Sequence, residues 1–241
     1  MHQHPSALAE KGEAAYGVSY EANHAAGIAI VSLTGVIMKR APEMLCGPKV
    51  IDLVALDGLL DEIAADSLID TVIFDISSPG GMMAGLQETC DRMRELSSEG
   101  IRLIAYADYQ LTSAAYYLAC ACDEIYCAPS TALGSIGVYC AGLDDSRSWE
   151  MDGMELVLAK SGKLKAMGHP GKAWAPEERE WLQAMADATG KQFRDWVTTR
   201  RGSVPDASMQ GQWFFAKDAA PQLHDGLYRD LPALLSHLIP A

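Results

Sequence analysis

The sequence predicts an α/β protein built on a parallel β-sheet with helices packed against it. Short apolar runs that suit buried strands alternate along the chain with longer amphipathic stretches that suit helices. The chain has 241 residues and is 49% hydrophobic, which is enough to bury the core of one such domain. We therefore expect a loose arm over residues 1–25 and a single domain over residues 26–241, with a helical C-terminal part from about residue 176.

The expected strands differ in their apolar pattern. The first, 27–37, alternates apolar with small or polar residues, whereas 71–76 is a continuous apolar run of the kind found in buried parallel strands. Gly80 and Gly81 break the chain soon after this second strand. Further strands are expected at 102–107, 123–127, 134–138 and 155–160.

Between these strands, four stretches are expected to be helical: 49–66, 83–99, 113–120 and 176–201. The last is the longest, and Pro176 suits its first turn, with Glu177 and Glu178 near the positive end of the helix dipole. The remaining tail is expected to cap the domain and to end in an amphipathic stretch at 231–239.

The composition excludes several classes of function. With 19 Lys and Arg against 32 Asp and Glu, the formal charge is −13, which disfavours nucleic acid as a partner. No apolar run reaches the length of a membrane span, and the N-terminus lacks a secretory pattern, so we expect a cytoplasmic protein. The six cysteines are expected to be free buried thiols, and no cofactor or metal is expected because no zinc-finger spacing is present.

Ser113 is the first candidate for chemistry. It follows the strand 102–107 and begins the predicted helix 113–120. A serine at a helix start commonly caps the helix by accepting a backbone N–H bond. It can instead act as a nucleophile whose oxyanion is held by the unpaired N–H groups of the first turn.

The Ser-Pro-Gly-Gly segment of residues 78–81 is the second candidate. It can simply be a strand-to-helix turn. Alternatively, Gly80 and Gly81 let the backbone approach a substrate closely and direct N–H groups at a carbonyl oxygen. Because the segment lies one βα unit before Ser113, both should lie at the same edge of a parallel sheet.

A serine nucleophile needs a base. Lys165 is the candidate, in a loop framed by Gly162 and Gly168, because a lysine can take a proton when burial keeps it neutral. His169 is the alternative, while Lys160 and Lys163 are expected to remain solvated.

Five motifs in a fixed order carry a resemblance to a known family. They are DISSPGG (75–81), TSAAYYLA (112–119), ACDEIY (121–126), GSIGV (134–138) and SGKLK (161–165). In order and spacing they resemble the signal peptide peptidase A family of serine–lysine peptidases, including its phage head-maturation (capsid assembly) protease branch. The resemblance covers roughly residues 27–230 and implies a Clp protease/crotonase-like fold built from ββα units.

The resemblance implies a role for each motif. Ser113 would be the nucleophile and Lys165 the general base, with the oxyanion held near Gly80, Gly81 and Ala114. The apolar residues Met82, Met83 and Leu111 would lie beside the site and favour an apolar or small substrate residue. In single-domain members neighbouring protomers of a ring share each site, so a homo-oligomer is expected. The implied substrate is a polypeptide, such as a phage scaffold, portal or capsid protein in the host cytoplasm or prohead.

The chain departs from the family pattern next to Ser113. Two other functions also remain open. Bacterial signal peptide peptidases have Ser-Gly-Gly at the nucleophile, whereas this chain has Ser113-Ala114-Ala115, closer to the phage branch. One alternative is a catalytically silent assembly protein of the same fold. The other is a crotonase-type acyl-CoA enzyme, which would need carboxylate acid and base groups.

Overall fold

The computed structural model describes residues 17–42 and 49–239, which divide into two compact units. The first unit comprises the chain up to Gly137 and from Arg194 onward, and the second is Val138–Phe193. The helix α5 (Pro176–Arg201) begins in the second unit and ends in the first. The single domain expected over residues 26–241 stays a prediction, within which residues 138–193 form a compact unit of their own.

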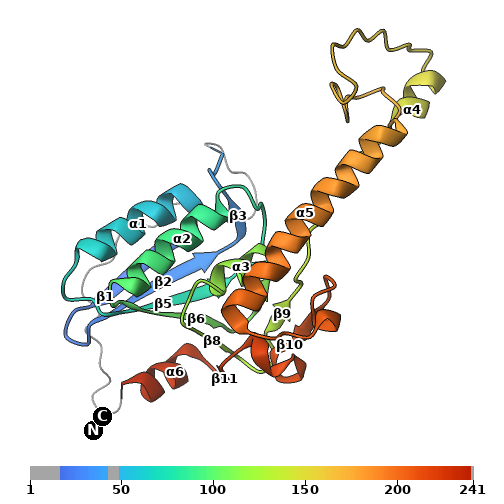
Figure 1. Ribbon diagram of the computed structural model, residues 1–241. Coiled ribbons are helices and arrows are strands. Elements are labelled where there is room, and N and C mark those ends of the chain that lie inside the picture. The colour runs from blue at the N-terminus through green and yellow to red at the C-terminus, as the bar shows by residue number, and fades with distance from the viewer. Residues whose placement is uncertain (1–16, 43–48, 240–241) are drawn as a thin grey trace. The chain divides into compact units, whose positions relative to one another are not determined.

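The first unit is built on a six-stranded sheet of order β1-β2-β5-β6-β8-β11 (Figure 1). Only the pair β1–β2 is antiparallel, and the other neighbours are parallel. The strands are β1 (Val18–Asn23), β2 (Ile28–Thr34), β5 (Thr71–Ser77), β6 (Arg102–Ala107), β8 (Glu124–Cys127) and β11 (Gly226–Leu227). This mostly parallel sheet confirms the predicted α/β class.

The first unit also contains two smaller sheets. In the first, β3 (Val36–Met38) pairs in parallel with β4 (Val50–Asp52). In the second, β9 (Ala132–Gly134) lies between β7 (Gln110–Thr112), which is parallel to it, and β10 (Trp213–Phe215), which is antiparallel. The second small sheet leads directly into the candidate nucleophile.

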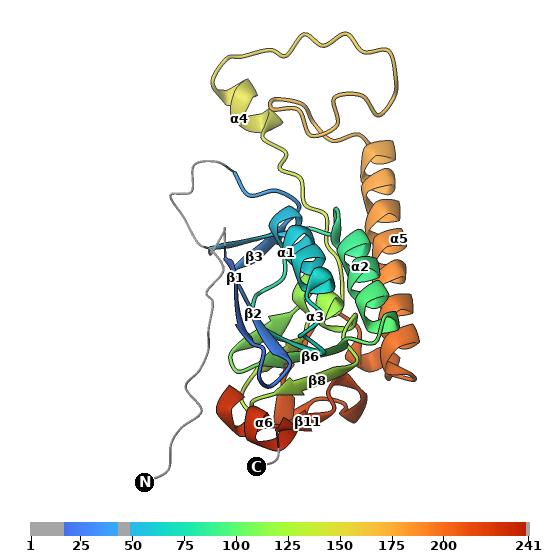
Figure 2. The same ribbon diagram turned by 90° about the vertical axis from the view of Figure 1, so that its left-hand side faces the viewer.

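Helices cover both faces of the main sheet. The helices α1 (Leu53–Ala65) and α2 (Leu86–Ser98) lie on one face, and α6 (Leu231–Leu238) lies on the other (Figures 1 and 2). Asp52 begins α1 by accepting the N–H bonds of Val54 and Ala55, as a helix cap does. The buried residues of α1 recur at helical spacing, at Leu53, Leu56, Leu59, Leu60 and Ile63.

The short helices of the structure complete the connections. The helix α3 (Ala114–Ala119) follows β7, and α4 (Ser146–Met151) lies in the second unit. Three 3-10 turns occur in the tail, at Asp206–Ser208, Ala216–Asp218 and Pro221–Leu223. In the described part of the chain, no helix is both long and apolar enough to cross a bilayer.

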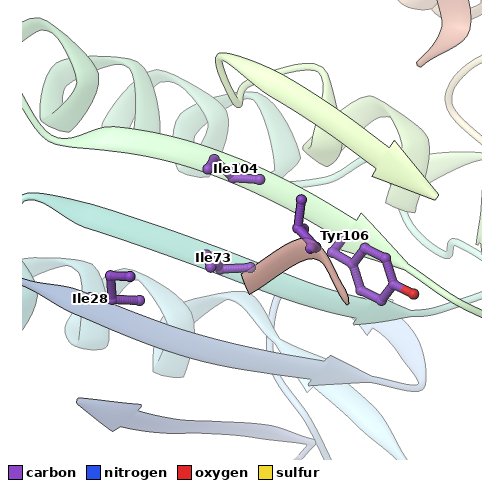
Figure 3. Close-up of a cluster of buried hydrophobic side chains, with 5 residues drawn as sticks. Ile28, Ile73, Ile104 and Tyr106 are labelled. Atoms are coloured by element: carbon purple, nitrogen blue, oxygen red, sulfur yellow. The ribbon is translucent and has the colours of Figure 1, made fainter. Parts of the chain in front are cut away.

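The terminal helix α6 is fixed to the sheet by an apolar cluster. Leu234 packs with Ile28, Ile73, Ile104 and Tyr106, which come from three adjacent strands (Figure 3). Burying a leucine side chain of this kind stabilises a fold by about 1.5–3 kcal/mol. The amphipathic stretch expected at 231–239 therefore forms the predicted helix and covers a sheet face.

Three expectations for regular structure were wrong. The loose arm expected over residues 1–25 includes β1, which pairs along its length with β2, while residues 1–16 lie outside the described residues. The strand expected at 134–138 ends at Gly134 and belongs to the small sheet rather than continuing the main one. Residues 155–160 form no strand, because within the described chain they have no partner strand, and Val157 is 89% exposed.

The second unit is held by polar contacts rather than by an apolar core. Glu178 in the first turn of α5 is buried, and its carboxylate lies 2.5 Å from the Lys172 ammonium and 3.8 Å from that of Lys160. It also accepts the backbone N–H of Ala175, which caps the start of α5. The hydrogen bond from Lys172 holds the pKa of Glu178 below its usual range.

Candidate active site

Ser113 lies at the turn between β7 and α3, in a backbone conformation that an L-residue rarely adopts. Its φ is 55° and its ψ is −127°. The turn is held on both sides, since the Ser113 N–H donates to the Gly134 carbonyl at 2.8 Å and the Tyr117 N–H donates to the Ser113 carbonyl at 3.0 Å. Strained residues of this kind persist only where the surroundings enforce them, and they cluster at functional sites.

The hydroxyl of Ser113 does not cap the helix that it begins. Ser113 is at the N-cap position of α3, but its side chain makes no capping hydrogen bond. The side chain is half-buried, and its oxygen has no hydrogen-bond partner among the described residues. The capping interpretation is therefore wrong, and the hydroxyl is left available for chemistry.

The segment around Gly80 is held between two strands. On one side, the Ser78 N–H donates to the Gln110 carbonyl at 2.8 Å, which joins the segment to β7. On the other, the Ile37 N–H donates to the Gly80 carbonyl and the Met82 N–H to the Ile37 carbonyl, both at 2.9 Å. These bonds fix the segment beside the turn that carries Ser113.

Glycine is required at position 80 because the backbone of the Ser113 turn packs directly against it. Gly80 has a φ of +98°, and an added Cβ would lie 2.7 Å from the Ser113 Cβ and 2.8 Å from the Ala114 nitrogen. At Gly81 an added Cβ would lie 2.1 Å from the Ile37 carbonyl oxygen. The structure thus brings Gly80 and Ser113 together, as the sequence predicts.

The three candidate oxyanion donors differ in what their amides do. The Gly80 N–H donates to the Ser78 hydroxyl oxygen at 3.1 Å, so it is already engaged. The N–H groups of Gly81 and Ala114 have no acceptor among the described residues. Gly81 is also exposed, which leaves its amide accessible to a substrate.

Two of the apolar residues expected beside the site, Met82 and Leu111, differ in their exposure to solvent. Met82 is 50% exposed, and its backbone is fixed by Ile37, so its side chain is available to a substrate. Leu111 bridges Ser78 and so lies beside the candidate site, but its side chain is fully buried and is not open to a substrate.

Lys165 lies in the second unit, on a turn closed by its own N–H bond to the Gly162 carbonyl at 3.1 Å. Its side chain is exposed, and its ammonium has no carboxylate partner among the described residues. In contrast, the nearby Lys160 and Lys172 both pair with Glu178. Of these three lysines, Lys165 is the one not committed to an ion pair.

Three of the described histidines are engaged elsewhere. The Nδ1 of His169, the alternative base, lies 2.7 Å from the Pro170 carbonyl oxygen. His24 pairs with Asp66, and the Nε2 of His224 lies 3.1 Å from the Ala216 carbonyl oxygen. Burial lowers the pKa of His224. In the described ranges, no group of three or more His, Cys, Asp or Glu side chains is arranged to hold a metal ion.

Comparison with known proteins identifies the family. Residues 95–223, which include Ser113 and Lys165, match the model of peptidase family S49. The chain belongs to this family. The match covers more than half of the chain, and it extends from the end of α2 to the C-terminal turns.

Two curated relatives come from bacteriophages. The capsid assembly protease C of Escherichia phage lambda is 28% identical over 73% of this chain, and the head-tail preconnector protein GP5 of Enterobacteria phage P21 is 29% identical over 75%. The chain spans 40% and 36% of the length of these two proteins.

A solved structure shows the fold independently of sequence. An enoyl-CoA hydratase/carnithine racemase from Magnetospirillum magneticum superposes with a TM-score of 0.52, covering 95% of this chain and 73% of the other. The two sequences are 15% identical, so the likeness establishes the Clp/crotonase-like fold and nothing about the reaction.

Proposed function

We propose that the protein is a serine endopeptidase with Ser113 as nucleophile and Lys165 as general base. The observation that carries the proposal is the Ser113 turn, which is strained, packed against Gly80 and left without a capping bond. A structural serine at this position would gain stability from capping the helix. A nucleophile must keep its oxygen free for a substrate carbonyl and a base.

The reaction follows from these groups. The Ser113 oxygen attacks the peptide carbonyl carbon while the neutral Lys165 amine takes the hydroxyl proton. The N–H groups of Gly81 and Ala114 hold the oxyanion of the tetrahedral intermediate. Lys165 then gives its proton to the leaving amine as the C–N bond breaks, which leaves an acyl-enzyme. Water, deprotonated by Lys165, hydrolyses the ester and restores the serine.

Assembly of several copies is part of the proposal. A lysine acts as a base only when neutral, and removal from water favours that form. In the single chain the Lys165 side chain is exposed. A second copy that covers Lys165 and supplies the facing Ser113 would meet this requirement, as in a ring whose sites are shared between protomers.

We propose that the substrate is a polypeptide of phage or prophage capsid assembly. The support for this role is the similarity to the two phage proteins named above, one of them a capsid assembly protease. A signal-peptide-peptidase-like role is the related alternative. The acidic surface suits neither a nucleic-acid substrate nor the phosphates of coenzyme A.

Cleavage of an unfolded protein tests the proposal. Wild type, Ser113→Ala, Lys165→Ala and the control Lys163→Ala are compared on reduced, carboxymethylated casein, with the native mass of each recorded. We expect Ser113→Ala and Lys165→Ala to lose at least about 10³-fold in kcat while assembling as the wild type does. Lys163→Ala should remain active. Equal cleavage by all four proteins contradicts the proposal, and cleavage by none despite normal assembly supports a silent assembly protein.

A further inference from the structure

Ser113 follows β7 of the three-stranded small sheet, and β10 is the outer strand of that sheet. The proposed cleavage chemistry uses neither the free backbone edge of β10 nor its exposed aromatic side chains. We propose that the free edge of β10, with the side chains of Trp213 and Phe215, binds an extended segment of the substrate polypeptide away from the scissile bond. The inference rests on the proposed peptidase function and adds a second binding site to it. It concerns only residues of the first unit.

The backbone of β10 leaves one edge open. Its pairing with β9 is bounded by two hydrogen bonds, from the Ser135 N–H to the Gln212 carbonyl at 2.8 Å and from the Ala216 N–H to the Thr131 carbonyl at 2.9 Å. In an antiparallel ladder, bonded pairs alternate with non-bonded pairs. Trp213 and Phe215 fall at the non-bonded positions, so their N–H and C=O groups point away from β9.

No described residue accepts or donates a backbone hydrogen bond at these outward positions, and β10 has a single partner strand. A strand edge of this kind pairs readily with an extended chain. The edge therefore offers two N–H donors and two C=O acceptors at the spacing of a β-ladder.

The side chains of β10 supply an apolar platform. Trp213 is 54% exposed and Phe215 is 46% exposed, and their rings meet edge to face with centroids 5.4 Å apart. The residues across from them on β9 are Gly134 and Ala132, which add little or no side chain to that face. Two aromatic side chains at alternate positions fit the alternate side chains of an extended apolar segment.

The free edge of β10 lies close enough to Ser113 for one substrate chain to reach both. Thr112, Gly134 and Trp213 lie in one row across β7, β9 and β10. The carbonyl of Gly134 accepts the N–H bond of Ser113 itself. A chain added to β10 would lie about three strand spacings, roughly 15 Å, from β7, a distance that four or five extended residues span.

Because of this spacing, only long substrates can contact both Ser113 and β10. A peptide with two or three residues on each side of the scissile bond cannot reach β10, whereas an unfolded protein can occupy both places. The edge should therefore lower KM for long substrates and leave kcat and short-peptide cleavage unchanged.

A proline substitution isolates the backbone contribution. Phe215 has a φ of −67°, the value that proline requires, and its N–H points away from β9. Phe215→Pro therefore removes one outward donor without disturbing the ladder, and Phe215→Ala removes the side chain alone. Trp213→Ala removes the other ring. The control is Leu68→Ala, another exposed apolar residue, 60% exposed in the turn before β5.

Binding is measured first, in the Ser113→Ala background, by the fluorescence anisotropy of labelled, reduced and carboxymethylated casein. We expect Trp213→Ala to weaken binding about tenfold, Phe215→Ala about threefold, and Phe215→Pro a further threefold beyond Phe215→Ala. In the active background the same variants should raise KM for casein by similar factors and leave a six-residue peptide unaffected.

Two results overturn the proposal. If all three variants bind casein as tightly as Leu68→Ala does, β10 is not a polypeptide-binding edge. If Phe215→Pro binds as Phe215→Ala does, the contact is not made by strand pairing. The binding assay needs no catalysis, so a failed peptidase assignment would be seen separately, as casein cleavage that survives Ser113→Ala.

Discussion

The two units of the chain hold their candidate catalytic residues in opposite ways. Ser113 is fixed by backbone hydrogen bonds between two strands and by the close approach of Gly80. Lys165 lies on an exposed turn of a unit whose one buried charged side chain, among the described residues, is Glu178. The candidate nucleophile Ser113 is pre-organised in the single chain, whereas the candidate base Lys165 would need further surroundings to act as proposed.

Glycine substitutions give the sharpest contrast between the two units. Gly80→Ala should destabilise the protein by about 2–4 kcal/mol and lower peptidase activity at least about 100-fold, because the new methyl group meets the Ser113 Cβ and the backbone of Ala114. Gly162→Ala, on the Lys165 turn, has nothing within 4 Å of the added Cβ and should change neither quantity. Denaturant unfolding and casein cleavage of both variants test this. A stable and fully active Gly80→Ala protein would contradict the conclusion that Gly80 fixes the Ser113 turn.

Core truncation should affect only the first unit. Leu234→Ala deletes a buried side chain between α6 and the sheet and should lower the free energy of unfolding by about 2–4 kcal/mol. Val157→Ala, in the exposed segment of the second unit, should change it by less than about 0.5 kcal/mol. Urea unfolding of both proteins measures the difference. If Val157→Ala lowered the free energy of unfolding as much as Leu234→Ala does, the second unit would have an apolar core of its own.

The same contrast explains how far the sequence could predict the structure. The buried strands β5 and β6 and the helix α5 have strong local patterns, and all three form close to their expected limits. Residues 155–160 have an apolar pattern as good as that of a real strand, but a strand also needs a partner edge, which no local pattern reveals. In the same way, β1 was missed because its stability comes from pairing with β2.

The sequence proposes the residues of a candidate site but not their geometry. The motifs identify Gly80 and Ser113, and the structure brings them together. Sequence could not reveal that the Gly80 amide is used by Ser78, because that depends on how the turn folds back. Nor did it single out Trp213, since its place beside Gly134 arises from a pairing between residues far apart in the chain.

A half-buried carboxyl group should make the stability of the first unit depend on pH. Asp75 of β5 lies beside Tyr106 on the sheet, and burial together with the charge of Asp108 raises its pKa to about 6. Its stabilising contribution is therefore complete below its unfolded pKa of about 4 and is lost as the pH rises through 6. Asp75→Asn should stabilise the protein by about 1–2 kcal/mol at pH 7.5, and this gain should vanish near pH 4.

Unfolding at several pH values measures the effect, with Asp70→Asn, an exposed residue directly before the same strand, as the control. A gain for Asp75→Asn that is the same at pH 4 and pH 7.5 would show that the carboxyl does not titrate in this range.

Substituting Glu178 in the second unit should have the smallest effect of these changes, a local change in hydrogen exchange. Glu178→Gln keeps the shape of the side chain but removes the charge that attracts Lys160 and Lys172. Hydrogen exchange should quicken for the amides of residues 160–178 and stay unchanged in β5 and β6. Glu177→Gln, on the exposed side of the same turn, is the matched control. Unaltered exchange at 160–178 would show that these ion pairs do not hold the Lys165 segment.

Mixing two inactive variants tests whether assembly completes the proposed Ser113–Lys165 dyad. Ser113→Ala and Lys165→Ala proteins are dissociated, mixed in equal amounts and reassembled, and casein cleavage is compared with that of each variant alone. If neighbouring copies share each site, random mixing should restore about a quarter of the wild-type activity, because one pairing in four joins an intact serine to an intact lysine. A mixture that stays inactive, although it assembles and the wild type cleaves casein, would contradict the shared site.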